Sequence, residues 1–411
     1  MDVVVVGGGA AGFFAALSVK EHNPECNVTI LEKADTVLSK VKISGGGRCN
    51  VTHSCFDIPK LVSFYPRGGS FLKKAFHQFQ PKDTIQWFED RNVRLMTQPD
   101  NRIFPQSGSS QTIIDCFLEN ARKLNIHIQT GCDVTRISFP DEQKAFEITV
   151  KKKQTGSGSA EANKKTIVAD KVIITTGGLS KNSFLFATEI KINNPVASLF
   201  SFNINDKALT DLMGLSFPSV SVKIPELRLR ENGDMIITHW GLSGPAVLKI
   251  SSVAARALHD INYRFKMVVN WSQNNAEIWQ NDLFAFKEKL SKQKIKNHYS
   301  GWSQRFWVYL LTKANLDIDK LWRDLSKKEI YRLVQFICHD EFLVEGKTTF
   351  KEEFVTCGGV DLSEIHHMTM ESKKHKGLYF AGEVLDIDGV TGGFNFQAAW
   401  TTGYIAGQLM S

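Results

Sequence analysis

The amino-terminal residues show an apolar run, a glycine-rich turn and a second apolar stretch. Val3 to Val6 form a short β-branched run, which predicts a buried strand. The glycines of GGGAAG follow at once, and Phe13 to Lys20 predict a helix directly after them. Another apolar run, Asn27 to Leu31, predicts a neighbouring strand. This order predicts a βαβ unit at the start of an α/β sheet.

Helical and strand-like patterns continue up to residue 190. A loop is expected at Ser39 to Thr52, and helical spacing is seen at Phe71 to Arg91 and Gln111 to Leu124. Strands are expected at Ile126–Gln129, Val134–Phe139, Ala145–Val150 and Thr166–Thr175. The polar sequence KKKQTGSGSAEANKK, residues 151–165, predicts a connection between two of these strands. Together they predict a three-stranded crossover that returns to the parallel sheet.

The composition changes after residue 190, which predicts an inserted segment. Further strands are expected at Ala197–Ile204, Ser219–Ile224, Met235–Thr238 and Phe265–Val269. A helical pattern rich in aromatic residues runs from Asn275 to about His339, and Gly377 to Ala381 predict a final strand of the first sheet. We therefore expect a discontinuous α/β domain made of residues 1–190 and 354–411. The insert comprises a β-rich domain at 191–274, a helical subdomain at 275–339 and a return segment at 340–353.

The first glycine turn has the spacing of a Rossmann-type dinucleotide site. Gly7, Gly9 and Gly12 fit G-x-G-x-x-G, in which the first glycine permits a tight turn, the second lets the backbone approach a pyrophosphate and the third lets helix and strand pack closely. The following helix N-terminus favours phosphate. Glu32 ends the second strand, where a carboxylate accepts hydrogen bonds from a ribose. The alternative is a βαβ unit without a ligand.

Other glycine-rich segments indicate a flavin. Three consecutive glycines in KISGGGRCNVT indicate backbone pressed against a ligand, and TTGG at Thr175 to Gly178 ends a strand at the edge where open α/β sheets bind ligands. AGEVLDIDGVTGGFNFQAAWTTG, Ala381 to Gly403, predicts a second helix N-terminus, which would stabilise negative charge at the pyrimidine edge of a reduced flavin. The two ends of the chain are thus expected to form one site for flavin adenine dinucleotide (FAD).

Four motifs that occur in order, KISGGGRCNVT, RIFPQS, THWGLSGPAVL and GEVLDIDGVTGGFNFQAAWTTG, resemble those of the BaiN-like, YhiN-type NAD(P)/FAD-dependent oxidoreductases. The resemblance covers essentially the whole chain. It implies a discontinuous FAD-binding domain with a β-barrel-like insert and a helical subdomain, and one branch of the family is similar to bile-acid double-bond reductases. The residues expected at the cofactor are Gly7, Gly9, Ala10, Ala11, Gly12, Glu32, Lys33, Lys40, Gly46, Gly47, Arg48, Cys49, Asn50, Val134, Thr176, Gly177, Gly382, Glu383, Gly392, Gly393, Phe394 and Asn395.

The candidate catalytic groups each have a structural alternative. Arg48 suits an anionic phosphate or reduced flavin, or else stabilises its loop. His239 in THWGLSGP is a candidate proton donor, or else a histidine bonded to backbone. Asp386 and Asp388 are candidate acids or orienting groups, or else turn residues. The substrate is expected between the flavin face and the β-rich insert.

We expect an FAD-dependent oxidoreductase that transfers hydride through flavin N5. The net reaction is left open between reduction of an activated C=C bond, with NADH or NADPH as the transient reductant, and oxidation of a small donor by oxygen. No second complete G-x-G-x-x-G segment is present, so a nicotinamide would use the substrate cleft. One alternative is an oxidase of a small amine. Another is a flavin-containing RNA-binding or redox-sensing protein.

Composition narrows the class of protein. The 411 residues are 42% hydrophobic, as in globular proteins, and no apolar run nears the roughly 20 residues that span a bilayer, so we expect a cytoplasmic protein without membrane contact. Cys49 and Cys55, separated by five residues rather than four, are expected to be ordinary thiols. No metal is expected, because His and Cys do not cluster. The net charge of +7 is modest, so a small-molecule substrate is favoured over nucleic acid. The oligomeric state is left open.

Overall fold

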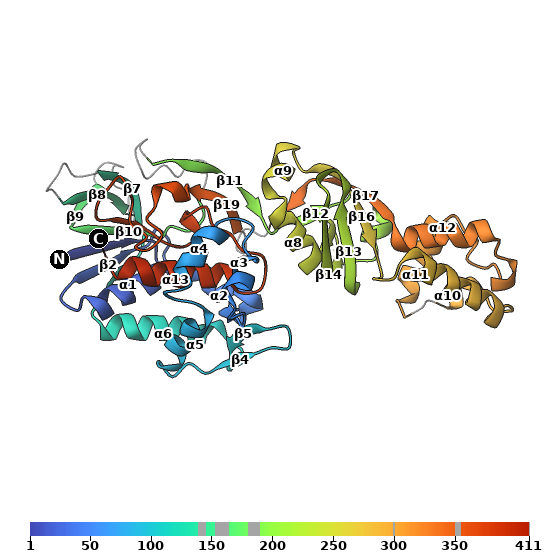
Figure 1. Cartoon of the computed structure of the whole chain (residues 1–411), viewed down its shortest axis with the longest axis horizontal. Coiled ribbons are helices and arrows are strands. Elements are labelled where there is room, and N and C mark those ends of the chain that lie inside the picture. Colours follow the sequence, from blue (N-terminus) through green and yellow to red (C-terminus); the bar gives the residue numbers. More distant parts are fainter. Residues whose placement is uncertain (139–144, 153–163, 180–189, 299–300, 350–354, 411) are drawn as a thin grey trace, which may run out of the picture. The chain divides into compact units, whose positions relative to one another are not determined.

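The computed structural model describes residues 1–138, 145–152, 164–179, 190–298, 301–349 and 355–410 (Figure 1). The chain forms two compact units, Met1–Ser198 with Lys351–Ser411 and Leu199–Phe350. These limits differ by a few residues from the predicted boundaries, because β11 (Ile192–Ser198) pairs with β19 (Val355–Val360) of the first unit. The finer division of the insert into three segments stays a prediction.

A five-stranded parallel sheet forms the centre of the first unit. Its order is β20-β10-β1-β2-β6. Its strands are β1 (Asp2–Val6), β2 (Asn27–Leu31), β6 (His127–Gln129), β10 (Lys171–Ile174) and β20 (Leu378–Phe380). Val3–Val6 of β1 and Val172–Ile174 of β10 are buried at consecutive positions, which explains why these runs are apolar throughout rather than at every second residue. The predicted βαβ unit and the final strand are confirmed.

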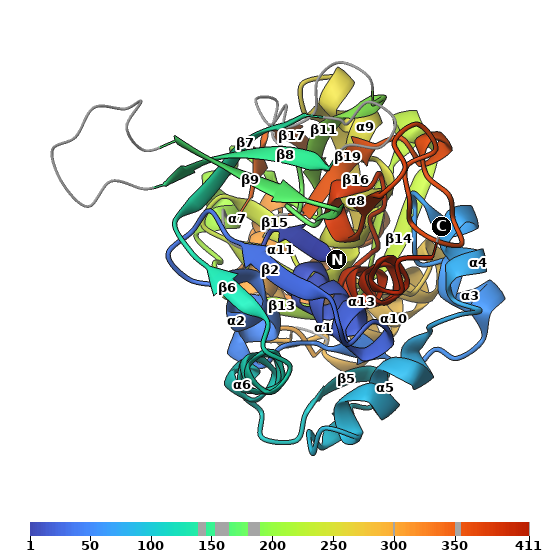
Figure 2. The ribbon, with the colours of Figure 1, turned by 90° about the vertical axis from the view of Figure 1, so that its left-hand side faces the viewer.

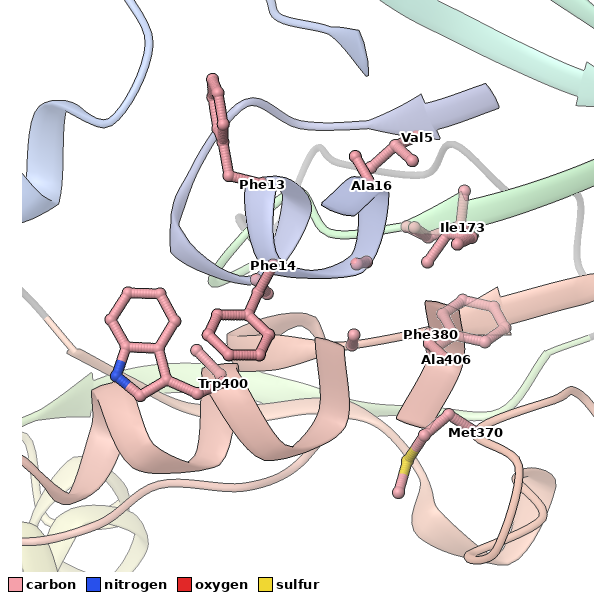
Figure 3. Close-up of a cluster of buried hydrophobic side chains, with 14 of the residues drawn as sticks. Val5, Phe13, Phe14, Ala16, Ile173, Met370, Phe380, Trp400 and Ala406 are labelled. Atoms are coloured by element: carbon pink, nitrogen blue, oxygen red, sulfur yellow. The ribbon is translucent and has the colours of Figure 1, made fainter. Parts of the chain in front are cut away.

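Two helices from opposite ends of the chain, α1 (Ala10–His22) and α13 (Phe394–Gly407), pack side by side (Figure 2). Glycines on α13 allow the close approach, because a Cβ on Gly407 would lie 2.5 Å from the carbonyl oxygen of Ala15. Around this contact the rings of Phe14 and Trp400 are 5.5 Å apart within the buried core (Figure 3). Packing between α1 and α13 therefore joins the two segments of the discontinuous unit.

Smaller elements surround this core. The helices are α2 (Ser39–Gly47), α3 (Ile58–Val62), α4 (Gly69–Ala75), α5 (Pro81–Glu89) and α6 (Ser110–Lys123). The strands β3 (Thr52–His53), β4 (Leu95–Thr97) and β5 (Arg102–Pro105) form one sheet. The crossover sheet consists of β7 (Cys132–Ser138), β8 (Phe146–Lys152) and β9 (Lys164–Ala169), in the predicted three-stranded arrangement.

The second unit contains a seven-stranded antiparallel sheet of order β17-β16-β13-β14-β15-β12-β18 among the described residues. Its strands are β12 (Ser201–Asn203), β13 (Ser216–Ile224), β14 (Leu229–Thr238), β15 (Gly241–Ser243), β16 (Arg264–Asn270), β17 (Asp340–Glu345) and β18 (Lys347–Thr348). The two edge strands, β17 and β18, are joined by the single residue Gly346, so the sheet curls until its edges meet. This is the barrel-like insert that the resemblance implied.

Helices complete the second unit. Those next to the sheet are α7 (Lys207–Thr210), α8 (Pro245–Val253) and α9 (Ala255–Asp260). The helical segment consists of α10 (Ala276–Lys289), α11 (Gln304–Lys313) and α12 (Lys327–Cys338) with short 3₁₀ turns between them. Ser326 begins α12 with a capping box, because its hydroxyl accepts from the backbone N–H of Glu329 while the Glu329 carboxylate accepts from Ser326 N.

Several predicted elements differ from the observed ones. The expected loop at Ser39–Thr52 begins as α2, although its glycines leave the helical conformation. The expected strand Ala197–Ile204 is two strands in different sheets, because Leu199 has a φ of 56° and turns the chain between them. The expected strand Thr166–Thr175 is likewise divided into β9 and β10. Phe139, positions 153–163 of the polar connection and positions 350–353 of the return segment lie outside the described residues.

Candidate functional site

The glycine turn after β1 gives each of its three glycines a distinct environment. Gly7 has a φ of 112°, and a Cβ there would lie 2.5 Å from Thr175 O. A Cβ on Gly12 would lie 1.9 Å from Gly7 O, so this glycine allows α1 to pack against the turn. A Cβ on Gly9 would meet none of the described atoms within 4 Å. The first and third glycines are required by the fold, whereas the second leaves open space in front of the backbone.

The N-terminus of α1 lies at this open position. Gly9 is its N-cap residue and provides no side-chain cap, and its first turn contains no acidic residue. Ala10 is half-buried and Ala11 is buried, so neither side chain extends far from the turn. The first N–H groups of a helix lack partners within the helix and carry partial positive charge. This combination fits a phosphate group of a dinucleotide.

Glu32 lies directly after β2, beside the glycine turn. Its Oε2 accepts from Gly8 N at 2.7 Å and its Oε1 accepts from Ala34 N at 2.8 Å. These contacts fix the carboxylate, and each oxygen retains a further lone pair for a ribose hydroxyl. The neighbouring Lys33 is exposed and pairs with Asp133 at 3.3 Å. Val134, the other residue expected here, is buried in β7.

The GGGRCN loop begins in the last residues of α2. Gly45, Gly46 and Gly47 have positive φ of 57°, 68° and 82°, and Cys49 has a φ of 62°, whereas Arg48 has a φ of −95°. A Cβ on Gly46 or Gly47 would meet nothing within 4 Å among the described atoms. Arg48 lies over the Phe104 ring at 4.4 Å and donates from Nε to Gly45 O at 3.3 Å. These two contacts favour the loop-stabilising role for Arg48.

The GGGRCN loop and the carboxyl-terminal glycine segment meet. With its amide oriented to satisfy both partners, Asn50 donates to Thr52 O and accepts from Gly393 N, each at 3.0 Å. Gly393 is the N-cap of α13, and a Cβ there would lie 2.7 Å from Thr52 O. The two glycine-rich segments, distant in sequence, thus form one local structure.

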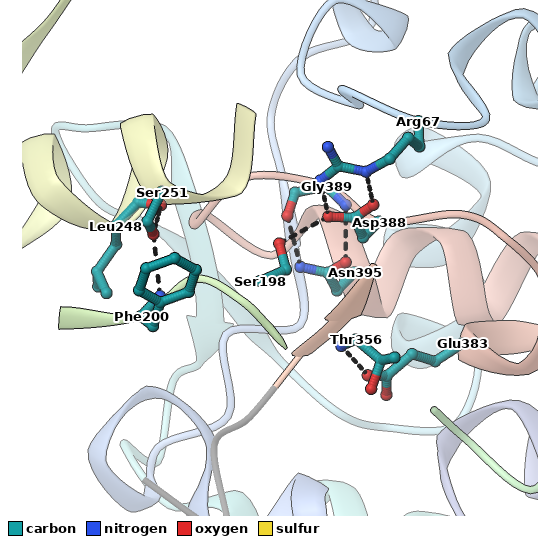
Figure 4. A network of polar contacts seen from close by, with 10 residues as sticks. All are labelled: Arg67, Ser198, Phe200, Leu248, Ser251, Thr356, Glu383, Asp388, Gly389 and Asn395. Atoms are coloured by element: carbon teal, nitrogen blue, oxygen red, sulfur yellow. Dashed lines mark hydrogen bonds and ion pairs between the residues drawn. The ribbon is translucent and has the colours of Figure 1, made fainter. Parts of the chain in front are cut away.

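The first residues of α13 are fixed by side-chain contacts. Asn395 accepts from Gly389 N at 2.8 Å and donates to Gly389 O at 2.9 Å, which closes the loop before the helix (Figure 4). Phe394 stacks on Phe64 at 4.3 Å, and a Cβ on Gly392 would lie 2.9 Å from the Phe394 ring. The side chains of Phe394 and Asn395 therefore orient the helix start, and contact with a cofactor would come from its backbone.

A third group of expected residues lies around Glu383, just after β20. Glu383 Oε2 pairs with Lys40 Nζ at 2.8 Å, and its Oε1 accepts from Thr356 N at 2.8 Å (Figure 4). Gly177 has a φ of 74°, and a Cβ there would lie 3.9 Å from Glu383 Oε2. Gly382 packs against α1, since a Cβ there would lie 2.7 Å from the Ala11 side chain. Thr176, at the end of β10, is exposed.

These positions fit FAD on three observations. The glycine turns after β1 and α2 each contain positions with open space where a Cβ would be, the N-terminus of α1 has no side-chain cap, and Glu32 is held at the end of the adjacent strand. The residues after β1, β2, β10 and β20 lie at the carboxyl ends of parallel strands, where doubly wound sheets bind their ligands. The roles of individual residues toward FAD stay predictions.

Asp388 is placed differently from a typical acid catalyst. It is fully buried, forms a two-pronged ion pair with Arg67, and its Oδ2 accepts from Ser198 Oγ at 2.7 Å (Figure 4). Asp386 is also buried and accepts from Asn193 at 2.8 Å. These contacts favour structural roles for both carboxylates, and a catalytic role for Asp388 stays a prediction.

His239 belongs to the second unit, in the turn between β14 and β15. Its side chain is exposed, its ring centroid is 4.0 Å from that of Trp240, and it forms no hydrogen bond with the part of the chain that the structure describes. The expected structural alternative, a histidine bonded to backbone, therefore has no support. An exposed imidazole is free to exchange protons, as a proton donor requires.

Sequence reasoning missed three residues in the first unit. Arg67 pairs with Asp388, Tyr65 donates from its hydroxyl to Phe394 O at 2.7 Å, and His53 stacks on Phe394 at 4.8 Å. His53 directly follows the motif KISGGGRCNVT, so its position in sequence was a usable signal. Tyr65 and Arg67 lie in a segment without a recognisable motif.

The cysteines are reduced and buried. Burial raises the pKa of Cys49 to about 12, although Ser44 lowers it in part. The pKa of Cys55 is also raised by burial. A thiol with a raised pKa is a poor nucleophile and a poor redox centre. Within the described ranges no three His, Cys, Asp or Glu side chains gather as a metal would require, and no helix is long and apolar enough to cross a membrane.

Comparison with known proteins adds relatives along the full chain. A family described as HI0933-like protein Rossmann domain matches residues 1–409. A ribosomal RNA dihydrouridine synthase of Haemophilus influenzae is 29% identical over 416 residues, covering 98% of this chain and 96% of that protein. A 3-dehydro-bile acid delta(4,6)-reductase of Clostridium scindens is 23% identical over 417 residues, covering 98% and 97%.

A solved structure shares the fold over the same length. The 3-ketosteroid-delta4-(5alpha)-dehydrogenase from Rhodococcus jostii superimposes with a TM-score of 0.50 and 10% sequence identity, covering 99% of this chain and 96% of that one. At this identity the likeness concerns the fold alone.

Proposed function

The chain belongs to the HI0933-like Rossmann-domain family, and from that premise we propose that it reduces a carbon–carbon double bond conjugated to a carbonyl group. Family membership makes it a flavoprotein oxidoreductase with a Rossmann-type FAD-binding domain. The choice of reacting bond is supported by agreement between two full-length relatives. Dihydrouridine is uridine with the double bond next to a ring carbonyl saturated, and a delta(4,6)-reductase acts on double bonds conjugated to a 3-ketone.

The leading substrate is a uracil ring within RNA. This departs from the expectation of a small-molecule substrate, and the support is twofold. The relative named for ribosomal RNA is 29% identical to this chain, against 23% for the bile-acid reductase. The excess positive charge is also gathered in residues 287–332, which contain twelve Lys and Arg against five Asp and Glu, and such a concentration favours a polyanionic partner over a neutral steroid. A 3-keto steroid is the second candidate, because the full-length relative named as a bile-acid reductase acts on that chemistry.

Different residues of the first unit would bind different parts of the cofactor. The open backbone at Gly9 and the N-terminus of α1 would bind the pyrophosphate, and Glu32 would accept from the adenosine ribose. The backbone of Gly46 and Gly47 and the start of α13 would contact the flavin. When bound, FAD supplies hydride transfer through its N5 atom.

A nicotinamide supplies the hydride, and thus the two electrons, of the overall reaction. NADH or NADPH gives a hydride to the double bond in net terms, a proton is added to the carbon next to the carbonyl, and the oxidised nicotinamide leaves. His239 is the proposed source of that proton, since it is an exposed imidazole with no bonding partner among the described residues.

Anaerobic stopped-flow spectroscopy tests this function. The purified yellow enzyme is mixed with NADH or NADPH, and bleaching of the flavin band identifies the reductant. The reduced enzyme is then mixed with uridine-containing ribosomal RNA or with 4-androstene-3,17-dione. Return of the flavin band together with a two-hydrogen mass increase in the RNA supports the leading substrate. Reoxidation by oxygen and an amine-derived product alone would replace the proposal with an amine oxidase.

A further inference from the structure

The excess of positive over negative charge lies within residues 287–332, in the helical segment of the second unit. Residues 287–332 contain twelve Lys and Arg against five Asp and Glu, which leaves thirty-eight of each sign in the rest of the chain. This one segment therefore accounts for the whole net charge of +7. Such an uneven distribution indicates a surface for an anionic partner rather than general solubility.

Local acids neutralise only part of this segment. Asp319 pairs with Lys294 at 2.8 Å and with Lys296 at 2.7 Å. Glu329 pairs with Lys320 at 2.8 Å. Six further cations are exposed and form no ion pair with the described residues: Lys289, Lys292, Arg305, Lys327, Lys328 and Arg332. The excess charge is thus directed to solvent.

Five of these residues come together where α10 ends and α12 begins. Arg323 N donates to Ser291 O at 3.2 Å, which brings the chain at Lys292 beside the turn before α12. The Lys287 side chain donates to Leu325 O, which ties the last turn of α10 to the same place. We define the basic surface as Lys289, Lys292, Arg323, Lys327, Lys328, Tyr331 and Arg332, of which Arg323 is paired with Asp324 at 3.7 Å.

One face of α12 provides most of this surface. Lys328 and Arg332 are one turn apart, as are Lys327 and Tyr331, and all four are exposed. The opposite face of α12 is apolar and buried, with Ile330, Leu333, Val334 and Ile337 inside the helical segment. Tyr331 is 48% exposed although its ring lies 6.1 Å from that of Phe284. An exposed aromatic ring among cations offers a stacking platform for a base.

We propose that the basic surface holds the phosphate backbone of the RNA whose uracil is reduced, an inference that rests on the proposed function. RNA fits better than an anionic membrane, because the apolar face of α12 is buried and no apolar face of this helix remains for insertion into lipid. The cations supply affinity without reading sequence, and selection of the uracil is left to the catalytic site.

The test compares two triple variants of the full-length FAD-loaded enzyme. One replaces the face of α12, Lys327→Gln, Lys328→Gln and Arg332→Gln. The control removes the same charge from exposed cations of the first unit, Lys82→Gln, Arg122→Gln and Lys123→Gln. Binding of a fluorescent single-stranded oligouridine is measured by anisotropy from low to moderate salt.

We expect the α12 variant to bind the oligonucleotide about tenfold or more weakly, with the slope of log affinity against log salt reduced by about two for three lost phosphate contacts. The control variant is expected to bind as the unaltered enzyme does. Bleaching of the flavin by NADH or NADPH is expected to be the same in all three proteins, which also verifies that each is folded and loaded.

Each result has one meaning. Equal binding by the two variants overturns the basic surface, even if the enzyme reduces a uracil. Loss of binding only in the α12 variant supports the surface, even if no conjugated double bond reoxidises the flavin, in which case the proposed function fails alone. Binding of all proteins to phosphatidylserine vesicles but not to the oligonucleotide overturns the RNA proposal in favour of a membrane.

Discussion

Arg67 and Asp388 form a two-pronged ion pair inside the FAD-binding unit, with the carboxylate fully buried and a third hydrogen bond from Ser198. The pair joins the segment before α4 to the loop before α13. Because both carboxylate oxygens accept charged donors, Asp388 is placed to hold that loop rather than to exchange a proton with substrate.

Replacing Asp388 with Asn tests this assignment. The change leaves the half-buried Arg67 beside a neutral amide, so the free energy of unfolding is expected to fall by about 3 kcal/mol. The pH dependence of kcat per FAD-loaded enzyme is expected to stay unchanged. The double variant Arg67→Met/Asp388→Leu is the control, since removal of both charges should recover much of the loss. A lost pH limb in Asp388→Asn with normal stability would restore the catalytic role.

The first glycine turn predicts opposite results for two similar substitutions. In Gly9→Ala the new Cβ meets no described atom within 4 Å, so the fold is expected to be kept while FAD affinity falls about tenfold or more, as close approach of the pyrophosphate is blocked. In Gly12→Ala the Cβ would lie 1.9 Å from Gly7 O, so the apoprotein itself is expected to lose about 1–3 kcal/mol. Flavin fluorescence titration and thermal unfolding of the apoproteins separate the two. Equal FAD affinity in Gly9→Ala and the unaltered protein would contradict the assigned position of the pyrophosphate.

Because the cysteines are buried, we expect the flavin alone to take up electrons during a reductive titration. Burial holds Cys49 as a neutral thiol with a pKa of about 12, so it is expected to resist alkylation at pH 8 in the native enzyme. Anaerobic reduction is expected to consume about two electrons per FAD, the capacity of the flavin alone. The double variant Cys49→Ala/Cys55→Ala should titrate identically. Uptake of about four electrons, with two thiols lost on reoxidation, would show a redox-active pair.

Replacing His239 is expected to affect reoxidation of the flavin but not its reduction. His239→Gln is expected to slow reoxidation of the flavin by the double-bond substrate about a hundredfold, since a general acid contributes on that scale. Reduction of the flavin by the nicotinamide is expected to be unaffected. His259→Gln, another partly exposed histidine of the same unit, is the matched control. Equal reoxidation rates in both variants would exclude His239 as the proton donor.

The sequence predicted the glycine turns because their conformational demands are local. Gly7, Gly9 and Gly12 need only their own spacing and the adjacent strand and helix to be interpreted. The final strand at Gly377–Ala381 was also predictable, since an apolar run followed by a glycine segment is typical of a strand of the cofactor sheet, whereas its place beside β10 was not predicted. The discontinuity of the first unit followed from the same reasoning.

Contacts between distant segments could not be predicted. Arg67 is one of many charged residues in the sequence, and only the fold places it against the buried Asp388. The break at Leu199 was missed because a positive φ in a leucine has no sequence signal. Residues 197–204 were therefore interpreted as one strand, although the chain leaves the first unit between β11 and β12.

Asp340 lies buried at the start of β17 in the second unit. Its Oδ2 accepts from Trp271 Nε1 at 2.9 Å, and Lys313 Nζ lies 2.5 Å from Oδ1. Burial raises the pKa of this carboxyl to about 6, with Asp206 adding to the rise, while Lys313 and Trp271 act in the opposite direction. A raised folded-state pKa means that protonated Asp340 favours the folded state.

The sign of the pH effect follows from that shift. Stability contributed by Asp340 is fully present below its ordinary pKa near 4 and is lost as pH rises through about 6. The unaltered protein should therefore lose about 2–3 kcal/mol relative to Asp340→Asn between pH 4 and pH 7, measured by urea unfolding at each pH. Asp319→Asn is the control, because its pKa is lowered to about 2 by Lys294 and Lys296 and it stays ionised throughout this window. Its difference from the unaltered protein should be flat. If the unaltered protein instead gains stability relative to Asp340→Asn as pH rises, attraction to Lys313 outweighs burial. The buried pair then stabilises the second unit in its charged form.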